Sequence, residues 1–282
     1  MAALLAGRGR RLFLGAVIAA VAIVGGAQLW RHVRSQVLSE PEYRLTADRI
    51  EVSPTPAWIK SDIKLEALRQ SGLDREQSIL ESDLAERIAK AFELHPWVRR
   101  VRRVEKRTPA GVIVDLEYRR PTCMVEVPNG LYPVDAEGVL LPTADFTPEE
   151  ALVYPRVAGV VAVTEGPVGT PWRDPRVEGA CAIAELLGND WSRLWLYRIT
   201  PAARVDSSGE IEFEIETREG GQIVWGRAPG REPAEEPKAE EKRDRLLRLF
   251  ADATGSQTAG EGEIIDLRRR DDEPRPRTAA KP

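Results

Sequence analysis

The chain has 282 residues, and its 41 Lys and Arg against 45 Asp and Glu leave a net charge of −4. This length predicts two modest folded domains with flanking segments. The near balance of charge excludes nucleic acid as the expected partner, because a phosphate-binding surface needs a net basic face. We expect the short arginine clusters at 99–100, 102–103 and 268–270 to be solvated.

Residues suited to catalysis are scarce. The only cysteines are Cys123 and Cys181, and the only histidines are His32 and His95. Two cysteines so far apart make neither a disulfide framework nor a metal site; an oxidising compartment would permit one bridge, and buried free thiols are the alternative. Nothing beside His95 looks like an activated nucleophile. We therefore expect no enzyme activity, no cofactor and no small-molecule substrate.

An uncharged apolar run extends from Leu12 to Trp30, with arginines on both sides. As a helix rising ~1.5 Å per residue it would just cross a hydrocarbon core of ~30 Å. The flanking charge favours a cytoplasmic tail at 1–11 and a transmembrane helix at 12–31. A cleaved signal peptide is the competing interpretation, with small residues at 25–27 near its end. Either way, the bulk of the chain is predicted to be extracytoplasmic, and the first interpretation makes it a single-pass protein of the cytoplasmic membrane.

The next segment predicts a small module of α and β elements at 43–120. An extended stretch at 43–52 precedes two helical patterns, at 58–70 and 83–94. The spacing of Val98, Val101 and Val104 fits neither strand nor helix. Residues 112–119 alternate as a half-buried strand should. The order is β-α-α-β-β, so the fold class is α+β.

Beyond Pro121 the pattern changes to short strands and turns, which predicts a mostly antiparallel β domain at 121–268 with flanking helices at 175–187 and 240–253. The proline-rich, charged stretch at 228–239 is predicted to be a mobile loop. Residues 263–267 read as the last strand. The remainder, 269–282, is predicted to be a disordered tail.

Several short motifs follow one another along nearly the whole chain. After the basic tail and apolar run, they are His95-Pro96-Trp97-Val98, Tyr118-Arg119-Arg120-Pro121, Val134-Asp135-Ala136-Glu137-Gly138, Tyr154-Pro155-Arg156-Val157-Ala158-Gly159, Ile223 to Gly226, the helix from Lys242 to Phe250, and Ile265-Asp266-Leu267-Arg268. In this order and spacing the chain resembles the FtsQ/DivIB family of bacterial cell-division membrane proteins. The resemblance implies a POTRA domain followed by a β domain outside the membrane.

The same resemblance implies a non-enzymatic scaffold at the septum that recruits other septal membrane proteins. It also implies that a small coiled-coil division partner adds to the edge of the last strands by β-augmentation. Carried over by position, the partner-binding residues are Glu263, Ile264, Ile265, Asp266, Leu267 and Arg268. Lysine at Ile265 or Leu267 is then expected to weaken recruitment. The alternative is that this strand simply closes the sheet.

Two departures from the family pattern lie near that strand: Arg269 to Asp272 stand where an aromatic residue and a polar strand usually follow, and 228–239 is an insert. Two other functions compete. A POTRA-bearing assembly factor of outer-membrane barrels would carry many alternating strands of ~10 residues, and none is visible after Leu267. A cell-wall hydrolase would need a buried carboxylate pair, whereas Glu210 to Glu216 read as the solvated face of a strand.

Overall fold

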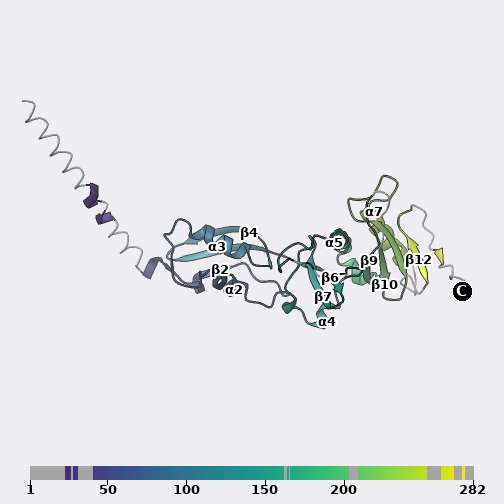
Figure 1. Cartoon of the computed structure of the whole chain (residues 1–282), viewed down its shortest axis with the longest axis horizontal. Coiled ribbons are helices and arrows are strands. Elements are labelled where there is room, and N and C mark those ends of the chain that lie inside the picture. The colour runs from purple at the N-terminus through teal and green to yellow at the C-terminus, as the bar shows by residue number, and fades with distance from the viewer. Residues whose placement is uncertain are drawn as a thin grey trace, which may run out of the picture. The chain divides into compact units, whose positions relative to one another are not determined.

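The structure is a computed structural model, drawn in Figure 1, which describes residues 23–26, 28–30, 41–161, 164, 166–202, 209–252, 262–269 and 275–276. Within these ranges, no helix has the length and apolar character needed to cross a membrane. The predicted tail at 1–11 lies outside them, and so does most of the predicted span at 12–31. Residues 23–26 and 28–30 are helical. Among them, Ile23 and Trp30 are 71% and 68% exposed.

Contacts within the chain define two compact units, and both mix helices with sheets. The first unit comprises 1–54, 63–93 and 100–116, as far as these are described. Its regular elements are β1 (Arg44–Leu45), β2 (Ile50–Val52), α2 (Ile63–Gln70), β3 (Gln77–Ser78), α3 (Leu84–Glu93), β4 (Val98–Arg107) and β5 (Gly111–Tyr118). Strands β2, β5 and β4 form one sheet in that order, with β2 parallel to β5, and β1 pairs with β3.

Hydrophobic spacing accounts for the best-predicted elements of this unit. In α3, Leu84, Ile88 and Phe92 recur every four residues and are fully buried. In β5, Val112, Val114 and Leu116 alternate with less buried neighbours, as predicted. Strand β4 is the edge of its sheet and most of its side chains are exposed, so it shows no alternation to detect.

The first predicted helix begins five residues later than its pattern indicates, at Ile63 instead of Trp58. The backbone N–H groups of Lys60 and Ser61 both donate to Oδ1 of Asp145, at 2.9 Å each. Trp58 donates its indole N–H to the carbonyl of Arg119. These contacts hold 58–61 outside the helix, and a local pattern cannot reveal them because the partners are distant in sequence.

The second unit comprises 55–62, 94–99 and the described residues from 117 onward. Its sheet has the strand order β13-β12-β11-β10-β9-β8-β6-β7. The strands are β6 (Pro121–Val127), β7 (Gly130–Asp135), β8 (Arg156–Val157), β9 (Leu196–Pro201), β10 (Glu212–Thr217), β11 (Gln222–Arg227), β12 (Glu263–Asp266) and β13 (Arg275–Pro276). The helices are α4 (Pro148–Ala151), α5 (Pro175–Leu187), α6 (Asp190–Arg193) and α7 (Ala239–Asp252).

Over the described residues, most strand pairs of this sheet are antiparallel, as predicted, but the sheet also contains parallel pairs. The pairs β6–β7, β9–β10, β10–β11 and β12–β13 are antiparallel. However, β6 and β8, β8 and β9, and β11 and β12 are parallel pairs. Parallel neighbours need a crossover, which α5 and α6 supply between β8 and β9, and α7 supplies between β11 and β12. Strand pattern alone does not distinguish these directions.

Helices α5 and α7 contribute to one hydrophobic core with a single face of the sheet (Figure 1). Cys123, Val125 and Val127 of β6 and Phe213 and Ile215 of β10 all point into this core. On β10 the intervening glutamates are half exposed, as the alternation predicts. Gly179 of α5 is required by the close packing, since a Cβ there would lie 2.4 Å from the ring of Phe213.

A buried carboxylate ties the start of the second unit together. Trp97 is fully buried and donates its indole N–H to Oδ2 of Asp145 at 2.6 Å. The other oxygen of Asp145 accepts the two backbone N–H groups of Lys60 and Ser61. One side chain thus joins three segments that are 36 or more residues apart in the sequence.

A second carboxylate, Asp135, organises the neighbouring turn. Its Oδ1 accepts the backbone N–H groups of Glu137 and Val139, while its Oδ2 accepts Arg119 at 2.6 Å. The backbone N–H of Arg119 donates to the carbonyl of Trp97. Gly138, with φ of +70°, completes the turn, and few residues other than glycine adopt that conformation.

Asp145→Ala should lower the free energy of unfolding by about 3 kcal/mol, because the buried indole N–H of Trp97 and the two partly buried backbone N–H groups of Lys60 and Ser61 lose their acceptor. Asp145→Asn should cost roughly half as much, since an amide oxygen can still accept from Lys60 and Ser61 but its NH₂ group opposes Trp97. Urea unfolding of the purified chain measures both. Glu149→Ala, on the exposed side of α4, is the control, and equal losses in all three variants would refute this role for Asp145.

Candidate functional site

Strand β12 holds the predicted partner-binding residues and lies near one end of the large sheet (Figure 1). It pairs in parallel with β11, with Ile264 opposite Gln222 and Ile265 opposite Ile223. On its other side, over the described residues, β13 pairs with it only at Glu263 and Ile264. The predicted tail at 269–282 lies largely outside the described residues, apart from Arg269 and this short strand.

The six predicted residues divide between the core and the surface. Ile265 and Leu267 are 6% and 0% exposed and belong to the hydrophobic core. Glu263, Ile264, Asp266 and Arg268 are half-buried. Lysine at Ile265 or Leu267 would place a charge in the core, so weaker recruitment by these variants would not separate lost partner contact from lost stability.

The backbone of β12 has an inner and an outer side. Leu267 donates its N–H inward to the carbonyl of Val224 at 2.9 Å. Because hydrogen-bonding directions alternate along a strand, the N–H and C=O groups of Ile264 and Asp266 point away from β11. Over the described residues, the pairing with β13 does not extend to Asp266. Outward-pointing backbone groups are those that an additional strand pairs with.

Arg268 fastens the end of β12 to the sheet. Its side chain donates two hydrogen bonds to Asp266, at 3.1 and 2.9 Å, and one across β11 to Glu212 of β10 at 3.0 Å, while its backbone N–H also donates to Asp266. Burial acts to raise the pKa of Asp266, but the bonds from Arg268 outweigh it, and the pKa lies below its ordinary value. Both side chains are charged at neutral pH, so the ion pair between Arg268 and Asp266 persists there.

A buried ion pair holds the segment 228–239 against the same end of the sheet. Lys242 of α7 is fully buried, lies 5.3 Å from the centre of the Trp225 ring, and donates to Glu236 at 2.5 Å. Burial lowers the pKa of Lys242 despite the carboxylate. Glu236 also accepts the backbone N–H of Arg227. A Cβ on Gly226 would lie 2.1 Å from Glu236, so this position requires glycine.

The segment 228–239 is therefore held to the sheet through Glu236, which its composition did not indicate. The sequence predicts a mobile loop at 228–239, but the side chains of Glu232 and Glu236 are only 1% and 7% exposed. Glu232 accepts the backbone N–H of Ala239 at the start of α7. A charged, proline-rich stretch usually remains solvated; here the buried Glu236 is paired with Lys242 and the buried Glu232 accepts backbone N–H groups.

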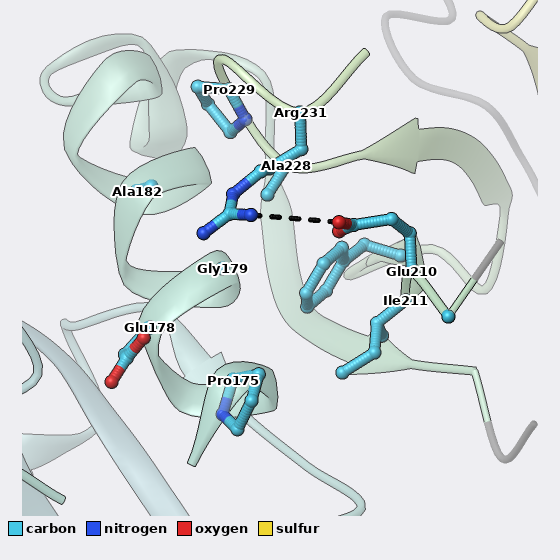
Figure 2. Close-up of a pocket in the computed structure, with 11 residues that line it drawn as sticks. Pro175, Glu178, Gly179, Ala182, Glu210, Ile211, Ala228, Pro229 and Arg231 are labelled. Atoms are coloured by element: carbon cyan, nitrogen blue, oxygen red, sulfur yellow. Dashed lines mark ion pairs between the residues drawn. The ribbon is translucent and has the colours of Figure 1, made fainter. Parts of the chain in front are cut away.

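A groove of about 420 Å³ lies between α5 and the segments 209–213 and 228–231. Its wall on α5 includes Gly179 and Ala182, and Ile211 lines the opposite side (Figure 2). Arg231 and Glu210 point toward one another across it, 3.6 Å apart. The groove thus combines apolar side chains with Glu178 and one exposed ion pair.

Neither the edge of β12 nor the groove contains a nucleophile beside a base. Over the described residues, the side chains of His, Cys, Asp and Glu form no group of three or more that could hold a metal ion. No family model and no curated protein matches the chain. The candidate site is therefore the β12 segment predicted from the sequence, whose backbone groups at Ile264 and Asp266 point away from β11.

Lys242→Met should lower the free energy of unfolding by about 3 kcal/mol, because Glu236 is left as a buried charge without its cation. Adding Glu236→Gln should recover part of that loss, since a neutral amide can still accept from Arg227. Urea unfolding measures the single and the double variant. Lys238→Met is the matched control, because Lys238 is exposed and 3.7 Å from Glu232, and it should change stability by less than about 1 kcal/mol.

Proposed function

We propose that this protein is a non-enzymatic, membrane-anchored scaffold of bacterial cell division that recruits septal proteins through its extracytoplasmic units. Two independent lines support the proposal. The motifs resemble the FtsQ/DivIB family in order and spacing along nearly the whole chain. In addition, β12, at the position the resemblance assigns to the partner, presents outward-pointing backbone groups that, over the described residues, pair with β13 at Glu263 and Ile264 alone.

The architecture of the first unit is compatible with a POTRA domain. Its main elements run β2, α2, α3, β4, β5, which is the β-α-α-β-β order inferred from sequence. The two helices carry buried apolar stripes, and the sheet has β5 at its centre. Such a unit offers surfaces for other proteins without requiring a catalytic centre, in keeping with a scaffold.

The open part of the β12 edge is the single observation that carries the proposed function most directly. β-augmentation takes its affinity from main-chain hydrogen bonds and needs a strand whose outer groups are accessible. Ile265 and Leu267 fix β12 in the core while leaving those groups outward. An incoming strand would extend along Asp266 and replace the pairing of β13 at Glu263 and Ile264.

A fluorescent fusion to the N-terminus, imaged in dividing cells of the source organism, tests the proposed function. A band at the division site, with division blocked on depletion, is the expected result. An even membrane signal with normal division after depletion would refute the scaffold proposal. A signal throughout the cytoplasm would refute the membrane anchor at 12–31.

Ile264→Pro should reduce the recovery of septal proteins with the full-length chain by about tenfold or more. Proline removes the outward N–H but leaves the inward bonds to β11, and edge strands tolerate it. Ile264→Thr is the matched control, because it changes the same side chain and keeps the N–H. Quantitative mass spectrometry after purification in detergent compares the two, and equal recovery from both variants would contradict backbone pairing at this edge.

A further inference from the structure

The two cysteines of the chain meet inside the second unit. Cys123 lies on β6 and Cys181 on α5, 58 residues apart in sequence, and both are fully buried. Their sulfur atoms are 3.0 Å apart. That distance is shorter than the contact between two packed sulfur atoms, and closing it to a bond length of about 2 Å needs a movement of only about 1 Å.

We propose that Cys123 and Cys181 form an intramolecular disulfide that covalently joins α5 to the sheet. The chemistry of this disulfide does not depend on the proposed division role. Its formation in cells rests on the extracytoplasmic location proposed above. An oxidising compartment permits such bonds, whereas the cytosol keeps thiols reduced.

The backbone around Cys123 aligns the pair. In the β6–β7 pairing, Pro121 lies opposite Asp135 and Cys123 opposite Val134, so Thr122 is an extra residue in a β-bulge. Both Thr122 and Cys123 therefore contact α5: the hydroxyl of Thr122 donates to Glu185 at 3.3 Å, and Cys123 meets Cys181. Cys181 and Glu185 are one helical turn apart, on the same face of α5.

Other uses for this pair are less well supported. A structural zinc site needs four ligands, and over the described residues no group of three or more candidate ligands gathers. A reactive thiol would need exposure and a low pKa. Instead, the hydrogen bond with Cys123 and burial raise the pKa of the Cys181 thiol. The pair is therefore inert once folded, and we place the oxidation during folding, before α5 covers β6.

The reaction is thiol–disulfide exchange with an external disulfide, either glutathione disulfide or the disulfide of an oxidoreductase. One cysteine thiolate attacks that disulfide, forms a mixed disulfide and releases one thiol. The second cysteine thiolate then attacks the protein sulfur of the mixed disulfide and releases the other thiol. The two cysteines lose two electrons and two protons, and both pairs appear on the released thiols.

Refolding the reduced full-length chain in detergent with glutathione disulfide tests the proposal. Intact mass should fall by two hydrogen atoms, alkylation in denaturant should find no free thiol, and a non-reduced digest should link the peptides of Cys123 and Cys181. Oxidation should raise the melting temperature by about 10 °C, because the bond closes a long loop. The double variant Cys123→Ala, Cys181→Ala should show no difference between oxidising and reducing buffer.

Two alkylatable thiols after oxidative refolding, or disulfide-linked dimers, would overturn the proposal. The mass and alkylation readouts need only the wild-type chain, so they remain decisive even if the alanine variants do not fold. Acid-trapping of thiols in intact cells is a separate measurement. A pair that oxidises on refolding but is reduced in cells would refute the extracytoplasmic location and leave the disulfide chemistry intact.

Discussion

The second unit depends first on the carboxylate of Asp145, which satisfies buried donors from two segments that precede it by more than 40 residues. Trp97 alone would be a large apolar side chain with an unpaired N–H, and 60–61 alone would be a loop with unpaired backbone groups. Burying either without an acceptor costs free energy. Asp145 resolves both requirements at once, and this is why 55–62 and 94–99 fold with the second unit.

Two kinds of connection, hairpins and helical crossovers, build the sheet from β6 toward β12. Hairpins set β7 beside β6 and β11 beside β10, while helical crossovers bring β9 and β12 into parallel pairings. Helix α7 carries the chain over the core before β12, and over the described residues that strand lies between β11 and β13. Two ionic contacts hold this end of the sheet: Arg268 with Asp266 and Glu212, and Lys242 with Glu236. A late strand, well fastened on its inner side, suits an edge that accepts another chain.

The spacing of hydrophobic residues along the chain was sufficient to predict elements whose buried face is set by residues close in sequence. The four-residue spacing in α3 and the alternation in β5 and β10 predicted those elements and their buried faces. Pattern failed where the deciding partner is remote. The delayed start of α2 depends on Asp145, the anchoring of 228–239 depends on Lys242, and the meeting of the cysteines depends on how α5 crosses β6.

The partner-binding segment was predicted as six consecutive residues, but consecutive residues of a strand cannot all face a partner. Successive side chains point to opposite faces, and the hydrogen-bonding groups of successive residues point to opposite edges. In β12 the core therefore uses the side chains of Ile265 and Leu267, whereas an incoming strand would use the backbone of Ile264 and Asp266. The choice between an edge strand and a closing strand thus concerns the backbone, and side-chain chemistry in the sequence carries little information about it. That is why the sequence left both possibilities open and why a proline, not a lysine, distinguishes them.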